Sequence, residues 1–319
     1  MKILEEIRKR AKSKDFKIIL PEANLDERVK NAVCEILKEG LSKLVVFGKP
    51  EEFSAEVRED KNCEIIDIAT SEKLEDFASQ LYELRKAKGM TEEQAKELVK
   101  LPIYFAMMML KNNLADGVVA GAKYSTADVL RPGLQIIKTK PGKNIVTGGM
   151  LMLKEDKDPL FFGDVSLIEN PTSEQLAEIA IASAEFMERV VGIEPKVAML
   201  SYSTKGSAKS EMVDKVQLAT QLAQGKGYLV DGEMQVDSAL DIATAKKKGV
   251  ASEVGGNANV LVFPDLNAGN IGYKLVARLG NYIAVGPIML NFNKPINDLS
   301  RGCTTEEIIN TVLITKLLV

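Results

Sequence analysis

Apolar and polar positions follow two alternating periods along almost the whole chain. Short runs of β-branched and other apolar residues are followed by longer segments in which apolar residues recur every three to four positions. The short runs predict strands at 17–20, 43–47, 64–68, 117–120, 143–147, 196–201, 228–230, 259–263 and 282–285. The longer segments predict helices at 26–38, 74–88, 101–111, 173–191, 210–222, 237–248 and 270–279. Strands that alternate with helices predict an α/β protein, with a parallel sheet covered on both faces.

Two clusters of Lys, Pro, Gly and Asp interrupt this pattern, at 139–149 and 156–163. They are the best candidates for a linker between an N-terminal half and a second α/β unit. A last helical pattern, 304–318, cannot form a domain by itself, so we expect it to return to the first half. The predicted domains are therefore 1–142 plus 299–319, and 143–298. We expect two three-layer αβα domains with mostly parallel sheets and a ligand-binding cleft between them.

The composition excludes several kinds of site. The 319 residues contain no histidine, which rules out a Ser-His-Asp triad and every histidine-ligated metal site. The net charge of −3 gives no reason to expect binding to nucleic acid or to an anionic membrane. No apolar run approaches the ~20 residues of a membrane-spanning helix. Three scattered cysteines indicate a reducing compartment, so we expect a cytoplasmic protein.

The sequence Asn-Asp-Leu-Ser-Arg-Gly-Cys at 297–303 carries the clearest chemical signal. It places the hydroxyl of Ser300 beside the permanent charge of Arg301. The next four residues, Thr-Thr-Glu-Glu, have the hydroxyl-then-carboxylate order of a helix start. A helix N-terminus offers free backbone N–H groups and positive dipole charge, and an arginine adds a fork of donors. This segment therefore predicts a site for a phosphate-like anion.

A second candidate is the loop 201–210, between a predicted strand and a predicted helix. It holds six hydroxyls and two lysines, and we take Ser201, Ser203 and Lys205 as its candidate substrate-binding residues. Polar groups beyond the carboxyl end of a parallel strand suit an anionic substrate. The spacing of a Walker A loop is missing, and a solvated loop without function is the alternative interpretation.

Other loops and arginines leave their interpretation open. The three acids in 231–237 either bind a metal ion or cap the next helix and order the loop, and we favour the second interpretation. The loop 264–270 either cradles a phosphate or forms a tight turn, and it lacks the glycine spacing of a nicotinamide site. Among only nine arginines, Arg28 and Arg131 closely follow strand ends, which favours anion binding. For Arg85 alone, an exposed helix surface is the default.

Taken together, these segments resemble those of the phosphate acetyltransferase (phosphotransacetylase) family. The resemblance covers roughly residues 17 to 315 and is carried by 84–86, 128–132, 201–210, 231–237, 263–274 and 297–303. It implies reversible acetyl transfer between acetyl phosphate and coenzyme A. It also implies that coenzyme A is a substrate, that no metal or prosthetic group takes part, and that the protein is a homodimer.

The resemblance further implies roles for individual residues. Ser300 and Arg301 match a Ser-Arg pair that lies beside the reacting acyl group. Arginines associated with phosphate groups match three positions: Arg28, Arg85 and Arg131. The base for the coenzyme A thiol is usually an aspartate six residues after the paired arginine. That position is Glu307 here, and Glu306 is the alternative base. We expect direct transfer, in which the base takes the thiol proton and the Ser-Arg pair stabilises the oxyanion and the leaving phosphate.

Rival interpretations remain at this stage. A phosphate butyryltransferase, or another acyl-phosphate:coenzyme A acyltransferase, differs by methylenes worth only ~1–3 kcal/mol each in discrimination. A metal-dependent dehydrogenase would need a cluster of acids and a dinucleotide site. A non-catalytic sensor of coenzyme A or acyl phosphate would tolerate the loss of Ser300 or Glu307. Within the transferase, Cys303 is either a covalent nucleophile or a small buried packing residue.

Overall fold

The computed structural model describes all 319 residues and divides them into two compact units. Residues 2–141 and 292–319 form what we call the terminal unit, and residues 142–291, with Met1, form the central unit. The sequence predicted that the chain returns to the terminal unit at 298/299, whereas in the structure it returns earlier, at 291/292. The reason is that the strand β11 (Ile296–Asp298) pairs with β4 (Gly117–Ala120) and so belongs to the sheet of the terminal unit.

The terminal unit is built on a five-stranded sheet in which every pairing is parallel. Its strand order is β11-β4-β1-β2-β3, where β1 is Lys17–Leu20, β2 is Lys43–Phe47 and β3 is Cys63–Ile66. The middle strands are short apolar runs that are almost completely buried, as expected where helices cover both faces.

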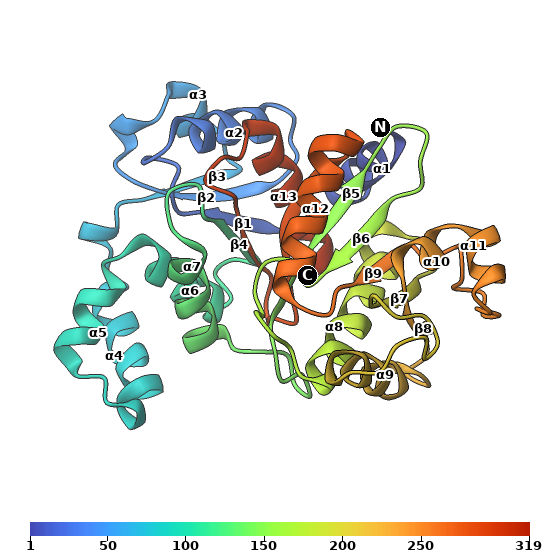
Figure 1. Ribbon diagram of the computed structural model, residues 1–319. Helices are drawn as coiled ribbons and strands as arrows, with labels where there is room; N and C mark the ends of the chain where they lie inside the picture. The colour runs from blue at the N-terminus through green and yellow to red at the C-terminus, as the bar shows by residue number, and fades with distance from the viewer. The chain divides into compact units, whose positions relative to one another are not determined.

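Helices surround this sheet. They are α1 (Lys2–Lys12), α2 (Glu27–Lys38), α3 (Ala55–Glu59), α4 (Leu74–Arg85), α5 (Glu92–Val99), α6 (Pro102–Lys111), α7 (Thr126–Pro132) and α13 (Thr305–Leu318). Helix α13 packs against α1 and α2 and is buried nearly all round, which suits its largely apolar sequence. Helices α4 and α5, cyan in Figure 1, lie side by side.

The central unit contains a six-stranded mixed sheet in the order β10-β5-β6-β9-β7-β8. The strands are β5 (Thr147–Leu153), β6 (Leu160–Gly163), β7 (Lys196–Leu200), β8 (Leu229–Met234), β9 (Val260–Val262) and β10 (Ile283–Leu290). Strands β6, β9, β7 and β8 are parallel, whereas β5 is antiparallel to both of its neighbours. The helices are α8 (Ser173–Phe186), α9 (Glu211–Ala223), α10 (Val236–Leu240), α11 (Ile242–Lys247) and α12 (Leu266–Gly280).

Two adjacent phenylalanines show how helices cover both faces of this sheet. The ring of Phe161 packs against Phe186 of α8, with ring centroids 4.6 Å apart. The ring of Phe162 packs on the other face, in the cluster that α10, α11 and α12 cover. Figure 1 shows α12 running over β5 and β6. No helix in either unit combines the length and apolarity needed to cross a lipid bilayer.

The predicted α/β class with mostly parallel sheets is confirmed, but several elements were placed wrongly. The strand predicted at 143–147 lies at 147–153, β6 lies in a stretch interpreted as linker, and β11 was not predicted. Glycines in β5 misled the prediction, yet a Cβ at Gly149 would overlap the ring of Phe161, so close packing requires glycine there. The helix predicted at 237–248 is two helices separated at Asp241, and α1, α5 and α7 were not predicted.

Candidate active site

Three adjacent strands of the terminal unit end at one edge of its sheet. Strands β1, β4 and β11 are parallel neighbours, so their carboxyl ends lie together. This edge is where open α/β sheets usually bind ligands. The predicted Ser-Arg pair lies immediately beyond the end of β11, and Arg28 lies on α2, the helix that follows β1.

Glu22 fixes the backbone that leaves β4. Its side chain is 1% exposed and accepts the backbone N–H groups of residues 121–124 at distances of 2.6 to 3.0 Å. Gly121 adopts φ +118°, and a Cβ there would overlap the carboxylate oxygen Oδ1 of Asp298. Only glycine allows this close approach between the two strand ends.

Arg28 holds the turn that contains the Ser-Arg pair. Its Nε and Nη2 donate to the two carboxylate oxygens of Asp26 at 3.0 and 2.8 Å. Its Nη1 donates to the backbone carbonyls of Arg301 at 2.9 Å and Cys303 at 2.8 Å. The hydrogen bonds that Arg28 donates to Asp26 raise the pKa of Arg28 above its ordinary value. The guanidinium thus contacts protein groups, and direct substrate binding by Arg28 stays a prediction.

Ser300 and Arg301 are exposed on this turn. The N–H of Cys303 donates to the carbonyl of Ser300 at 2.9 Å, and the N–H of Gly302 donates to the Ser300 hydroxyl oxygen at 3.3 Å. The guanidinium of Arg301 makes no hydrogen bond or ion pair. Backbone contacts therefore fix the turn while the arginine keeps all its donors available.

The predicted helix start follows the turn. The hydroxyl oxygen of Thr304 accepts the N–H of Glu307 at 3.2 Å, and the Glu307 carboxylate oxygen Oε2 accepts the N–H of Thr304 at 2.7 Å. This capping box satisfies two N–H groups at the start of α13. It occupies one carboxylate oxygen of Glu307 and leaves Oε1 without a hydrogen bond, whereas Glu306 is more exposed.

Cys303 lies beneath the turn rather than on it. Its side chain is 4% exposed, and burial raises the pKa of the thiol to about 11, although the charge of Arg28 opposes the rise. The thiol is therefore protonated at neutral pH. A protonated, buried thiol has neither the charge nor the access of a reactive nucleophile.

Arg85 and Arg131 share a neighbourhood in the terminal unit. Both charges act to lower the pKa of Tyr104, which burial raises, so both lie near its hydroxyl group. The Tyr104 hydroxyl donates to Gln135 Oε1 at 3.1 Å. The Nε of Arg85 is buried without a hydrogen-bond partner, and Arg131 is exposed at the end of α7. Two arginines with spare donors form a suitable anion site.

The loop 201–210 of the central unit uses most of its polar groups internally. The hydroxyl of Ser203, completely buried, donates to Glu233 at 2.8 Å, and the N–H of Gly206 donates to the same carboxylate at 2.7 Å. Burial favours a raised pKa for Glu233, but the hydrogen bonds from Gly206, Ser203 and Gln217, with that from its own backbone N–H, lower the pKa. Lys205 forms an ion pair with Asp231. Two of the three acids in 231–237, Asp231 and Glu233, therefore order this loop, as the favoured interpretation predicts.

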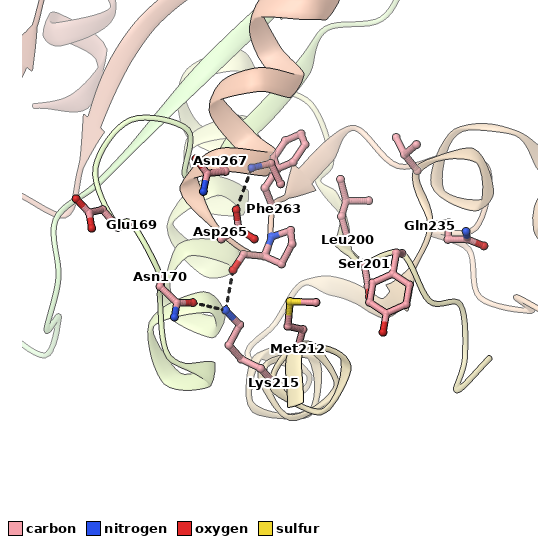
Figure 2. Close-up of a pocket in the computed structure, with 14 residues that line it drawn as sticks. Glu169, Asn170, Leu200, Ser201, Met212, Lys215, Gln235, Phe263, Asp265 and Asn267 are labelled. Atoms are coloured by element: carbon pink, nitrogen blue, oxygen red, sulfur yellow. Dashed lines mark hydrogen bonds between the residues drawn. The ribbon is translucent and has the colours of Figure 1, made fainter. Parts of the chain in front are cut away.

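Ser201 lies instead in the wall of a cavity of about 720 Å³ at the carboxyl ends of β7 and β9. Figure 2 shows Phe263, Leu200 and Met212 in its walls, with Lys215 on one side. The ammonium group of Lys215 donates to Asn170 Oδ1 at 2.8 Å and to the carbonyl of Pro264 at 2.9 Å. Apolar walls with a few polar groups are typical of small-molecule sites.

The sequence interpretation did not single out Tyr104, Lys215 or the buried carboxylate of Asp298. Tyr104 had a signal, because its hydroxyl is the single polar side-chain group within the apolar segment 102–110. Lys215 resembled any exposed lysine of an amphipathic helix. Asp298 was part of the quoted motif, but its burial depends on the pairing of β11 with β4, which was not predicted.

Comparisons with known proteins agree with this geometry. The profile of a family described as phosphate acetyl/butaryl transferase matches residues 2–316. The chain belongs to this family. A phosphate acetyltransferase of Clostridium acetobutylicum is 49% identical over 99% of this chain and 98% of its own length. One of Bacillus subtilis is 44% identical over 98% of each.

Solved structures agree as well. A phosphotransacetylase from Streptococcus pyogenes has a TM-score of 0.92 and 40% identity, covering 99% of this chain and 97% of that one. One from Staphylococcus aureus has a TM-score of 0.89 and 43% identity, covering 99% and 98%. The family resemblance inferred from the motifs is thus confirmed, and the protein is an acyltransferase.

Proposed function

We propose that this chain transfers an acetyl group reversibly between acetyl phosphate and coenzyme A, giving acetyl-CoA and phosphate. The observation that carries the proposal is the turn at the start of α13, where an exposed hydroxyl lies beside an arginine whose donors are all available. Relatives that are 44–49% identical and named phosphate acetyltransferase support acetyl over a longer acyl group.

The proposed mechanism is direct transfer within a ternary complex. Glu307 takes the thiol proton through Oε1, since its Oε2 already accepts the N–H of Thr304. The thiolate attacks the acetyl carbon, a C–S bond forms, and the bond to the phosphate oxygen breaks with its electron pair leaving on phosphate. Ser300 and Arg301 donate hydrogen bonds to the developing oxyanion and the leaving phosphate. Glu306 is the alternative base.

Direct transfer is favoured over an acyl-enzyme on Cys303. The buried thiol, with its pKa raised to about 11, is a poor nucleophile at neutral pH. Acetyl phosphate is already activated, and coenzyme A brings its own thiol. For the same chemical reason the proposed reaction needs no metal or prosthetic group, and coenzyme A acts only as a substrate.

Binding in this proposal is divided among the remaining candidates. Arg85 and Arg131 hold phosphate groups through donors that no protein group occupies, and Arg28 acts through the turn that it fixes. In the central unit, Ser201 contacts a substrate from the wall of the cavity. The hydrogen bonds and ion pair of Ser203 and Lys205 keep that loop in its conformation.

We also propose a cytoplasmic homodimer. Three cysteines without disulfides suit a reducing compartment. Helix α12 exposes Ile271, Leu275 and Leu279, four residues apart and so on one face, at 58%, 52% and 79%. The same apolar face on a second copy would cover this surface with two-fold symmetry. Light scattering should give twice the chain mass, and Leu275→Glu with Leu279→Glu should give monomers.

The test of the activity is an assay of the purified protein with coenzyme A and acetyl, propionyl or butyryl phosphate, following thioester formation. We expect kcat/KM to be highest with acetyl phosphate. A preference for butyryl phosphate would replace the proposed substrate. Binding of coenzyme A without turnover on any acyl phosphate would favour the sensor interpretation.

A further inference from the structure

Asp298 is the last residue of β11 and lies two residues before Ser300. Its side chain is 1% exposed, and the pairing of β11 with β4 places it against Gly121. The N–H of Leu299 donates to the carbonyl of Ala120 at 2.7 Å, so the chain is fixed on both sides of the carboxylate. The position of Asp298 is therefore coupled directly to the turn that carries the Ser-Arg pair.

The two oxygens of this carboxylate have different surroundings. Oδ2 accepts the hydroxyl proton of Thr126 at 2.6 Å, while Oδ1 is buried and has no hydrogen-bond donor. A buried carboxylate oxygen without a donor is costly, because ionisation there lacks the compensation that water provides. A residue kept only for packing would not need this charge, since an amide or an apolar side chain would fill the same space.

The hydrogen bond to Thr126 joins two parts of the proposed site. Thr126 is the first residue of α7, the helix that carries Arg131 near its other end. Asp298 therefore connects the turn of Ser300 and Arg301 with the helix of a proposed phosphate-binding arginine.

The charges near Asp298 act in opposite directions. Burial raises the pKa of Asp298 to about 6, and the charge of Glu22 adds to this rise, while the Thr126 hydroxyl, the backbone N–H of Leu299 and the charge of Arg301 oppose it. The elements packed against β11 carry further charged groups: Asp128 and Arg131 on α7, and Glu306 and Glu307 on α13. The charge of Arg301 thus favours the ionised form of this buried carboxylate, although the two side chains form no ion pair.

We propose that Asp298 is a positioning residue whose negative charge orients Arg301 and holds α7 in place for acetyl transfer. The inference rests on the proposed function and adds a residue to it. When Asp298 is ionised, its charge draws the guanidinium of Arg301 toward the end of β11, and its Oδ2 holds Thr126. When Asp298 is protonated, that attraction is lost and Arg301 is no longer aligned with the leaving phosphate.

The test compares the pH dependence of kcat/KM between pH 5 and 8.5 in the unmodified protein and in three variants. Asp298→Asn keeps the size and the acceptor for Thr126 but removes the charge. Thr126→Val removes the donor that favours ionised Asp298, and Thr126→Ser restores it. The unmodified protein should lose activity on the acid side with a midpoint near the pKa of about 6.

Asp298→Asn should lower kcat at pH 7.5 by about 10–100-fold, as expected for a misplaced catalytic group, and should remove the acid limb. Its Tm at pH 7.5 should not fall, because the buried charge without a full set of donors is gone. Thr126→Val should move the acid limb to higher pH, and Thr126→Ser should return it. A structural role alone would instead lower Tm together with kcat and leave the midpoints unchanged, which would overturn the proposal.

A readout that does not need turnover separates this inference from the proposed function. Carbon-13 NMR of labelled aspartate carboxyls follows ionisation of Asp298, and nitrogen-15 NMR follows Arg301 Nε. We expect both signals to titrate with the same midpoint, and the Arg301 change to disappear in Asp298→Asn. If the Arg301 signal does not change as Asp298 titrates, the positioning role is overturned even in an active enzyme. If the Asp298 and Arg301 signals share a midpoint in a protein that is inactive on every acyl phosphate, the interaction between the two residues is retained and the proposed function is rejected.

Discussion

Two strand-to-helix connections in this protein contain similar polar residues but use them differently. The loop 201–210 of the central unit directs the Ser203 hydroxyl and Lys205 to two acids of the neighbouring strand, Glu233 and Asp231. The turn after β11 in the terminal unit is held by backbone carbonyls and by Arg28, which leaves Ser300 and Arg301 exposed. Density of polar residues is therefore a weaker guide to a reactive site than the number of donors that the fold leaves unused.

The difference follows from where the anionic partners lie. In the loop, the buried carboxylates need hydrogen-bond donors because an unsatisfied charge in the interior is costly. Ser203 and Lys205 bind these carboxylates and are therefore not available to a ligand. In the turn, Asp26 satisfies Arg28, and Arg28 in turn satisfies two carbonyls. The guanidinium donors of Arg301 therefore remain available for a ligand.

The largest effect should come from Glu307, in the first turn of the helix after the exposed turn. Glu307→Gln keeps the capping box, since glutamine also accepts the N–H of Thr304, but it removes the base. We expect kcat to fall by about 10²–10⁴-fold with little change in Tm. The matched control is Glu306→Gln, which should be nearly unaffected. A larger loss in the control would move the base to Glu306.

The second-largest effect should be at Arg301, and it tests the comparison between the turn after β11 and the loop 201–210 directly. Arg301→Ala should lower kcat by about 10²–10³-fold, the usual cost of one preorganised donor to an oxyanion. Lys205→Ala should mainly lower Tm, because it leaves the buried carboxylate of Asp231 without its ion-pair partner. Circular dichroism and steady-state kinetics on both variants give the answer. The contrast between the two connections fails if Lys205→Ala loses as much turnover as Arg301→Ala while staying folded.

Effects at Arg85 and Arg131 should be smaller and should appear in binding. Each change to alanine should raise KM by about 10–100-fold, in line with a hydrogen bond to a charged group worth ~1.5–3 kcal/mol, and should lower kcat less. Added salt should reduce the difference from the unmodified protein. If KM for both substrates is unchanged in both variants, these arginines lie outside the site.

The smallest effect should be at Cys303, on the buried side of the same turn. Cys303→Ala should keep nearly the full kcat, because a thiol with a pKa near 11 takes no part in direct transfer. Exchange of labelled phosphate into acetyl phosphate without coenzyme A provides the second measurement. Lost turnover in the variant, together with such exchange in the unmodified protein, would make Cys303 the nucleophile.

Local sequence patterns predicted most of this fold but not its irregular parts. Parallel strands buried on both faces form uninterrupted apolar runs, so β1, β2 and β4 were placed correctly to the residue. Strand β11 has only three residues and reads Ile-Asn-Asp, which no local rule assigns to a strand. Its existence depends on a partner strand far away in the sequence, and long-range pairing of this kind leaves no periodic signal.

The features of the candidate active site, like those of the fold, were predictable where they depend on local sequence patterns. The capping pattern gave the start of α13 and the exposed Ser-Arg pair, since both are local features. The unpaired oxygen of Asp298 and the neighbourhood shared by Arg85 and Arg131 depend on tertiary contacts. Burial and missing partners are properties of the folded protein, so these features appear only once strands and helices are placed together.

The return of the chain to the terminal unit also affects the order in which the protein can be made. Strand β4 needs β11 as its outer neighbour, but the whole central unit is synthesised between them. At ~5–20 residues per second, translation of the 175 residues between the two strands, 121–295, leaves the edge of β4 unpaired for roughly 9–35 s. During that interval the nascent chain presents an open sheet edge, which is a known route to aggregation. Strand β11 thus closes the sheet immediately before the proposed catalytic pair, Ser300 and Arg301, is synthesised.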